Sequence, residues 1–378
     1  MSWSLKLFTI RGIPVRVHAS FLLILLWAAW LGLRTRAAGW PMGVLFWVVF
    51  TLLLFMCVVL HELGHSLVAQ LFGVSVQDIT LWPIGGMARF ARLPQRPYQE
   101  FLITAAGPAV NVLLAIILGT TALAWIGPRQ LYALVASPYQ LERMLTGVSA
   151  ETMLLMLALN NVLLVLFNLI PAFPMDGGRL VRSVLAAFMS FGRATKVASW
   201  LGQGTAVVMG LVGLRTGSLF LGLVGIFVFA AAWGERQQAV TDEHLRGLRV
   251  SQAMQPIGVR LHPLETLGAA ASRVAALPQG AYLVVDAGKL VGMLSRRDLL
   301  AALRKAGPEA RVGQHLGQEF VRLTPDETLI DADDTLAQAQ PPFGIVTENG
   351  QAVGLLGRGD IARLAETLES FSNALPRV

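Results

Sequence analysis

Charged residues are scarce in this sequence, and cysteine is almost absent. Asp, Glu, Lys and Arg together make up only 14% of the 378 residues, whereas 54% are hydrophobic. So apolar a composition excludes a pair of ordinary soluble domains. The single cysteine, Cys57, excludes an intramolecular disulfide framework, and its place inside an apolar run favours a packed side chain over a reactive thiol.

Long uncharged runs take the place of the missing charge. Gly43 to Leu60 contains no charged residue, and as a helix rising about 1.5 Å per residue it spans roughly the hydrocarbon core of a bilayer. Together with five further runs, this predicts an α-helical polytopic membrane protein with six transmembrane helices. The further runs lie near 19–33, 101–126, 149–170, 196–214 and 217–233.

The net charge of +7 is explained by membrane topology, because the basic residues flank the apolar runs and do not cluster in one soluble domain. Lys6, Arg11 and Arg16 precede the first run, whereas Arg34 and Arg36 after it oppose the trend. The overall distribution predicts a multi-pass protein of the cell membrane with cytoplasmic N- and C-termini. No nucleic-acid partner is expected.

The composition changes after Trp233, where charged residues return and the apolar runs shorten. Within this part, 281–298 and 343–360 share the order strand, turn, strand, helix, with Asp-Ala-Gly and Glu-Asn-Gly at the turns. The chain is therefore predicted to contain two kinds of structure. Its parts are a membrane domain at 1–235, a linker at 236–248, a first repeat at 249–308 and a second repeat at 309–378.

The repeat resembles a tandem pair of cystathionine-β-synthase (CBS) domains, which implies a C-terminal α/β tandem CBS domain. Ser295 and Asp298 match the family's nucleotide-contacting Ser/Thr-x-x-Asp turn. In the second copy Gly357 replaces the hydroxyl residue and Asp360 is retained. The resemblance implies a regulatory site for ATP or another adenine nucleotide. The alternative is a domain that only packs or forms a homodimer.

The pattern with the clearest chemistry is His61-Glu62-Leu63-Gly64-His65. On a helix, residues four apart lie on one face, so the two imidazoles can hold one metal ion while Glu62 takes a proton from a water. Ionisable groups at membrane depth cost roughly 3 kcal/mol each unless they are paired or liganded. A metal site therefore explains these residues better than two buried structural histidines.

Asp176 is the candidate for the third ligand that catalytic zinc usually takes. It is the only acid in 152–234, and it lies where two prolines and two glycines interrupt an apolar span within 167–179. Irregular backbone at membrane depth is tolerated where it lines a protein-enclosed cavity. The alternative interpretation is that the Asp176 carboxylate caps a helix or forms an ion pair with Arg179.

These motifs together resemble the CBS-containing, six-span branch of the site-2 protease family of intramembrane zinc metalloproteases. The resemblance implies that His61, His65 and Asp176 hold one Zn²⁺ per chain and that Glu62 is the catalytic residue. The implied reaction is cleavage, within the lipid bilayer, of the transmembrane segment of a single-span membrane protein. Nucleotide binding to the CBS pair would gate this reaction.

Four further positions match motifs of the same family. Asn168 is expected to contact the substrate backbone or the oxyanion, with a capping or interhelical amide as the alternative. Asn111 is expected to hydrogen-bond across the bundle or toward the site. Gly85 and Gly86 lie in the segment 83–90, which resembles a hairpin whose edge pairs with an unwound substrate strand. An ordinary loop is the alternative for this segment.

Two other functions fit parts of the sequence. A CBS-gated channel or transporter would need further charges inside the spans, and these carry almost none beyond the metal motif. A metal-binding regulator without catalysis would not need Glu62, which is present. The hypothesis of a protease accounts for more of these residues than the channel or the regulator does.

Overall fold

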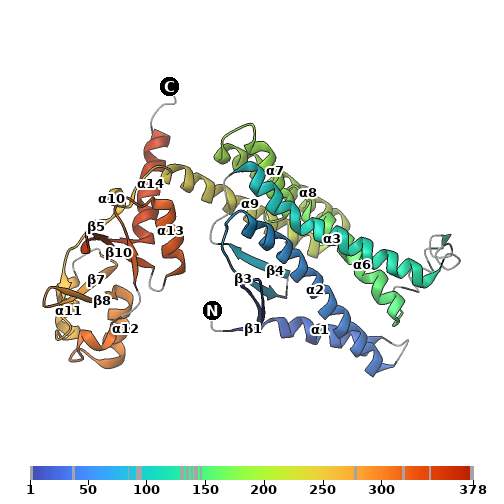
Figure 1. Cartoon of the computed structure of the whole chain (residues 1–378), viewed down its shortest axis with the longest axis horizontal. Coiled ribbons are helices and arrows are strands. Elements are labelled where there is room, and N and C mark those ends of the chain that lie inside the picture. Colours follow the sequence, from blue (N-terminus) through green and yellow to red (C-terminus); the bar gives the residue numbers. More distant parts are fainter. Residues whose placement is uncertain are drawn as a thin grey trace. The chain divides into compact units, whose positions relative to one another are not determined.

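The computed structural model describes residues 3–35, 39–83, 85–90, 96–127, 147–275, 279–316, 320–339 and 342–374, with isolated positions between 132 and 144. The chain divides into two compact units, Met1–Gln237 and Gln238–Val378, and Figure 1 labels most of their helices and several of their strands. Arg36, used in predicting the orientation, and Ile84, in the predicted hairpin, lie outside the described residues.

Long apolar helices dominate the first unit, as predicted. Among the described residues, five helices are long and apolar enough to cross a membrane. α1, Phe21–Arg34, is also apolar but has 14 residues, or about 21 Å against a hydrocarbon core of about 30 Å. The count of six spans, which includes α1, therefore stays a prediction. The five longer helices are α2 Trp40–Leu71, α3 Pro97–Ile126, α6 Ala150–Asn168, α8 Phe191–Thr216 and α9 Leu219–Leu245, and the short helix α7, Asp176–Ala186, stands between α6 and α8.

A four-stranded sheet packs against α2 in the same unit. Its order is β1-β2-β3-β4, with two antiparallel hairpins joined by a parallel β2–β3 pair. Ile13 of β2 and Ile79 of β3 are fully buried in a cluster with Phe55, Val59 and Leu63 of α2. One face of the sheet is thus fixed to the helix that carries the histidine motif. The strands are β1 Ser4–Ile10, β2 Ile13–His18, β3 Val76–Trp82 and β4 Gly85–Phe90.

A glycine sets the spacing between α2 and α3, which pack against each other and run side by side in Figure 1. A Cβ on Gly64 of α2 would lie 2.8 Å from the carbonyl oxygen of Ala106 and 2.9 Å from Val110 Cγ2 on α3. These distances are shorter than van der Waals contact. The two helices can therefore approach this closely because residue 64 has no side chain.

The second unit contains two small mixed sheets, with orders β6-β7-β8 and β5-β11-β10-β9. In each, two long antiparallel strands meet at a two-residue turn, and Ala287, Gly288, Asn349 and Gly350 all have positive φ, as type I′ turns require. The predicted repeat of strand, turn, strand and helix is confirmed. The elements are α10 Val250–Ala253, β5 Gln255–Pro256, β6 Arg260–Leu261, α11 Leu267–Val274, β7 Ala281–Asp286, β8 Lys289–Ser295, α12 Arg296–Ala306, η1 Val312–His315, β9 Val321–Leu323, α13 Leu329–Gln338, β10 Phe343–Glu348, β11 Gln351–Gly357 and α14 Arg358–Ala374.

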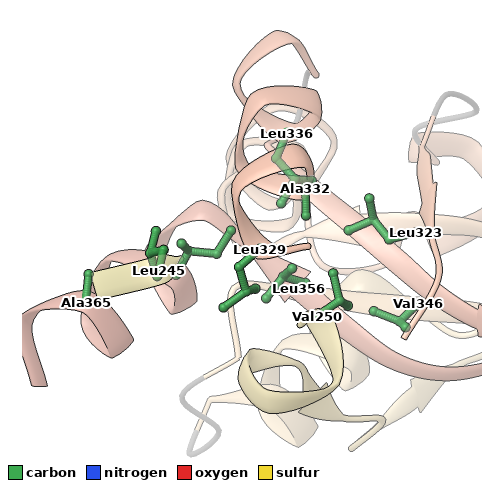
Figure 2. Packing of buried hydrophobic residues seen from close by; sticks show 10 residues of the cluster. Leu245, Val250, Leu323, Leu329, Ala332, Leu336, Val346, Leu356 and Ala365 are labelled. Atoms are coloured by element: carbon green, nitrogen blue, oxygen red, sulfur yellow. The ribbon is translucent and has the colours of Figure 1, made fainter. Parts of the chain in front are cut away.

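The two repeats exchange segments in their cores. Val250, from the start of the first repeat, is buried with Leu329 and Leu356 of the second, and Figure 2 shows these side chains gathered together. Val312, from the start of the second repeat, is buried with Leu261 of the first. Each repeat therefore completes its hydrophobic core with a segment from the other.

Candidate metal centre

Helix α2 brings the two histidines of the motif together in a buried position. His61 and His65 are each only 7% exposed, and their rings meet edge to face with centroids 4.7 Å apart. Their Nε2 atoms lie 3.0 Å from each other. Since residues i and i+4 share a helix face, the continuous helix through residues 60–70 produces the predicted convergence.

The third side chain comes from the break between α6 and α7. α6 ends at Asn168, α7 begins at Asp176, and the intervening chain turns through a hydrogen bond from the Ala172 N–H to the Ile170 carbonyl, 2.7 Å. A Cβ on Gly178 would lie 2.7 Å from the carbonyl carbon of Ala172. Glycine therefore lets α7 begin directly against its own preceding turn, which brings Asp176 to the histidines.

Three ligand atoms from these residues meet at one point. Asp176 Oδ2 lies 3.3 Å from His61 Nε2 and 3.2 Å from His65 Nε2. Ligand atoms bound to tetrahedral zinc at about 2.0–2.1 Å are about 3.3 Å apart. Asp176 Oδ2 is buried without a hydrogen-bond partner among the described residues, which also contain no ion pair between Asp176 and Arg179. The three atoms fit one divalent cation.

The second nitrogen of each imidazole faces a hydrogen-bond acceptor on α3. His61 Nδ1 lies 3.0 Å from Asn111 Oδ1, and His65 Nδ1 lies 2.8 Å from the carbonyl oxygen of Ile103. Each Nδ1 therefore donates its proton and leaves the Nε2 lone pair for a metal. Asn111 is fully buried, so the structure places it behind His61, where it bonds across the bundle. A contact of Asn111 with the substrate stays a prediction.

α3 also closes one side of the centre at Gly107. A Cβ at this position would overlap the His65 ring and lie 2.8 Å from His61 Nε2. Its neighbours are the two imidazoles, so a side chain here would displace the proposed ligands themselves.

Glu62 contacts the edge strand of the sheet. Its Oε2 accepts a hydrogen bond of 3.0 Å from the Ala88 N–H of β4, and a Cβ on Gly86 would lie 2.9 Å from Glu62 Cγ. β4 is the last strand in the sheet order, so its outer N–H groups have no strand partner among the residues that the structure describes. The half-buried carboxylate takes one of them, which orients it beside the histidines.

A buried carboxylate holds β4 in this place. Asp78 of β3 is 3% exposed, accepts a 2.8 Å hydrogen bond from Arg89 Nε, and lies 3.5 Å from Arg16 Nε of β2. Its hydrogen bond raises the pKa of the Arg89 guanidinium. Sequence reasoning missed this pair. The available signal was that Asp78 is the only acid in 63–99 and lies in an otherwise uncharged strand.

The predicted positions Gly85, Gly86 and Asn168 lie at the ends of elements of the first unit, as does His18. Gly85 and Gly86 begin β4, in the hairpin expected for this segment. Asn168 is the half-buried last residue of α6, on the other side of the break from Asp176. His18 stacks on Trp82 with ring centroids 4.0 Å apart, and it does not belong to the cluster of metal-ligating atoms found in the described part of the chain.

The predicted nucleotide contacts of the second unit lie at helix starts. Ser295 Oγ accepts from the Asp298 N–H at 3.1 Å and donates to Asp298 Oδ2 at 2.6 Å, which caps α12. Asp360 accepts from the Gly357 N–H at 2.9 Å and from Gln255 Nε2 at 2.7 Å. Asp360 thus binds the N–H of the residue before α14, whereas the serine hydroxyl of the first repeat binds an N–H in the first turn of α12.

Two family models match the chain, one in each unit. Residues 49–211, which contain both histidines, Glu62 and Asp176, match peptidase family M50. Residues 250–305 match the CBS domain. The two matches follow the division of the chain into a helical unit and a C-terminal α/β unit.

Similar proteins extend over most of the chain. A zinc metalloprotease of Methanocaldococcus jannaschii is 31% identical over 98% of this chain and 98% of its own length. The solved site-2 protease from the same organism is 36% identical, with 62% of this chain and 95% of that chain covered and a TM-score of 0.42. A CBS domain-containing protein of Bacillus subtilis is 30% identical over 31% of this chain and 84% of its own length.

Proposed function

Because the chain belongs to peptidase family M50, the site-2 protease family of membrane metalloproteases, we propose that it is a zinc-dependent intramembrane endopeptidase. Its substrates would be the transmembrane segments of single-span membrane proteins. The observation that carries this proposal is the meeting of His61 Nε2, His65 Nε2 and Asp176 Oδ2 within 3.3 Å of one another. Two imidazoles and one carboxylate are a donor set that suits catalytic zinc.

Glu62 is the proposed general base and acid. Zinc, when bound, polarises the scissile carbonyl and makes water a stronger acid. Glu62 removes a proton from the attacking water and later gives it to the leaving amine nitrogen. The Ala88 N–H holds the Glu62 carboxylate for this task. Asn111 and the Ile103 carbonyl hold the two imidazoles through their Nδ1 protons.

The substrate has to present an extended backbone. A peptide group inside a helix has its carbonyl occupied by an intrahelical hydrogen bond, so a transmembrane helix must unwind before cleavage. We assign the exposed edge of β4, which begins at Gly85 and Gly86, to pairing with the unwound strand. Asn168, the last residue of α6 before the break, is assigned to the substrate backbone or the oxyanion.

A second set of proposals concerns the C-terminal unit and the membrane. The CBS pair would bind ATP or another adenine nucleotide through Ser295, Asp298 and Asp360, gate cleavage, and support a homodimer. The match to the CBS domain model favours this role. We also propose cytoplasmic termini in the cell membrane, six spans including α1, a membrane domain at 1–235, a linker at 236–248 and repeats at 249–308 and 309–378.

The proposed function is tested with Glu62→Gln. Wild type and variant are purified, their zinc content is measured, and each is incubated with a single-span membrane protein in lipid vesicles. Because Gln cannot accept the proton, cleavage should fall by about 10²-fold or more, while zinc stays bound. Glu309→Gln, at an exposed position of the second unit, is the control with the same chemical change. Undiminished cleavage by Glu62→Gln would remove the proposed mechanism.

A further inference from the structure

Helix α3 presents one stripe of residues toward the metal centre. Glu100, Ile103, Gly107 and Asn111 are spaced by three or four positions, so they share one helix face. Ile103 and Asn111 accept hydrogen bonds from the histidines, and Gly107 leaves space for their rings. Glu100 instead binds Arg182 of α7, and α7 is the helix that begins with Asp176.

Arg182 is surrounded by charge and aromatic rings in a buried position. It is 7% exposed. Its Nε donates to Glu100 Oε1 at 2.9 Å, its Nη2 donates to the same oxygen, and its Nη1 donates to Glu235 Oε2 of α9 at 3.1 Å. Its Cζ lies 5.1 Å from the ring centroid of Phe173 and 4.9 Å from that of Phe191.

The guanidinium contacts the chain on both sides of Asp176. Phe173 lies three residues before Asp176, and Arg182 lies six residues after it, which is about 9 Å along a helix. The ring of Phe173 is fully buried. Arg182 therefore holds both the turn that leads into Asp176 and the helix that leads away from it.

General stability is a poor explanation for such a pair. Burying two charges carries a desolvation cost that often cancels their attraction, and apolar residues of similar size frequently serve as well. A planar guanidinium that donates two hydrogen bonds to Glu100 Oε1 and one to Glu235 Oε2 does, however, fix orientation in a way that apolar packing does not. Glu100 is 1% exposed, so the orientation is set deep inside the unit.

We propose that Arg182 and Glu100 are positioning residues for the metal centre. Their ion pair fixes α7 against α3, so that Asp176 Oδ2 meets the two imidazoles that the same face of α3 holds. Helix α3 thereby positions all three ligands. It bonds to the two histidines directly, and it positions Asp176 through the ion pair. This inference rests on the proposed role of Asp176 as a metal ligand.

Glu235 makes the weaker contribution. Its side chain is 32% exposed, against 1% for Glu100, so water screens its attraction to Arg182. The order of effects on metal binding should therefore be Arg182 and Glu100 first, then Glu235. If the three variants acted only by loosening the helix packing, their effects on metal binding would have no reason to follow this order.

The test uses the full-length protein in detergent, loaded with Co²⁺. The visible absorption spectrum of the ion reports its coordination geometry, and competition with a chelator gives its affinity. Arg182→Gln and Glu100→Gln should each weaken Co²⁺ binding by about 10- to 100-fold, the range seen when groups behind metal ligands are removed, and should change the spectrum. The double variant should bind no more weakly than the poorer single variant, because both remove the same interaction.

Three further variants make the result specific. Arg182→Lys keeps the charge and should recover part of the affinity, and Glu235→Gln should lose less than Glu100→Gln. Arg193→Gln removes an exposed arginine at the start of α8 and should leave both affinity and spectrum unchanged. Circular dichroism of the helices shows whether Arg182→Gln folds. If it does not, Glu100→Gln tests the proposal alone, because Gln keeps the shape of the Glu side chain and one acceptor oxygen.

The outcomes separate this inference from the proposed function. Wild-type affinity and spectrum in folded Glu100→Gln and Arg182→Gln would overturn the positioning role and leave the metal centre intact. Failure of the wild-type protein to bind Co²⁺ would overturn the metal centre itself. Loss of affinity in Arg193→Gln equal to that in Arg182→Gln would also remove the claim, because any nearby charge would then suffice.

Discussion

The carboxamide of Asn111 determines which nitrogen of His61 faces the metal. With Asn111 Oδ1 3.0 Å from His61 Nδ1, the Nδ1 proton is held there and Nε2 is free to bind. Asn111→Ala removes the acceptor, and we expect about 10- to 100-fold weaker zinc affinity, measured by chelator competition. Asn160→Ala is the control, because Asn160 bonds to the Met156 carbonyl of its own helix. Equal zinc affinity in the two variants would contradict this role.

A single methyl group at residue 107 should abolish the metal centre. The Cβ of Gly107→Ala would occupy the position of the His65 ring and press on His61. Retreat of α2 is opposed because Val59 and Leu63 pack against the sheet on its other side. Zinc content should fall below one tenth of the wild-type value, measured by atomic absorption. Gly119→Ala on the same helix is the control, since its Cβ would meet only Ala158 Cβ at 3.9 Å. Full zinc content in Gly107→Ala would show that α3 can shift.

The sequence could predict side chains at the centre but not the backbone groups around them. His61, Glu62 and His65 have a spacing with chemical meaning, and Asp176 is isolated in an apolar region. The Ile103 carbonyl and the Ala88 N–H have no such signal, because every residue except proline offers both groups. Their use depends on how α3 and β4 pack against α2. Glu100 and Arg182 are separated by 82 residues, so their pairing also required the tertiary structure.

Strand β4 donates a backbone hydrogen bond to Glu62, the proposed general base. Ala88→Pro removes the N–H that donates to Glu62 Oε2, at a position where the edge strand faces no further strand and proline is tolerated. The rate constant of cleavage should fall by about 10-fold or more, since an orienting hydrogen bond to the base is lost, while zinc stays bound. Kinetics in vesicles together with zinc analysis measure both quantities.

Ala88→Ser is the matched variant, because it keeps the N–H and nearly the same size. It should retain most of the activity. If Ala88→Pro cleaves as fast as Ala88→Ser, the contact between β4 and Glu62 has no role in orienting the carboxylate. If both variants lose zinc, the strand supports the fold of the centre instead.

Helices were easier to predict than the sheet for a physical reason. An uncharged run of eighteen residues has few alternatives to a transmembrane helix. β1 and β2 are short, and β1 exposes Leu5, Leu7 and Phe8, so its sequence shows no clear alternation between buried and exposed positions. The parallel pairing of β2 with β3 joins residues that are more than 60 positions apart, such as Val15 and Ile79. The β1–β2 and β3–β4 hairpins are both local, and the second of them contains the segment 83–90 in which the sequence predicted a hairpin.

At the scale of the whole molecule, the two repeats of the second unit share their hydrophobic cores. Val250 and Val312 are each buried in the core of the opposite repeat, and Leu283 and Ile345 share a cluster between the two sheets. The sequence predicted two similar segments because the turns and strands recur. It could not show the exchange, because apolar residues such as Val250 and Val312 do not specify the partner against which they pack.

Nucleotide control is the prediction that concerns both units. Asp298 caps α12 together with Ser295, and in the CBS resemblance the same pair contacts the ribose and phosphate of the ligand. A ligand that binds the folded unit raises its stability by mass action, by about 2.7 kcal/mol at one hundred times its Kd. We expect ATP to raise the unfolding temperature of the full-length protein and to change its cleavage rate, measured by scanning calorimetry and vesicle assay.

Asp298→Asn separates nucleotide binding from cleavage. Asn keeps an acceptor oxygen for Ser295, so α12 should stay capped, but it loses the charge and acceptor pattern that a ribose requires. The variant should cleave at the wild-type rate without ATP and should show neither the temperature shift nor the change in rate when ATP is added. Glu309→Gln, exposed in the same unit, should respond as wild type does. If millimolar ATP leaves the calorimetric trace of the wild-type protein unchanged, ATP does not bind the folded unit, because a bound ligand would raise the unfolding temperature. The CBS pair would then be a packing or dimerisation domain.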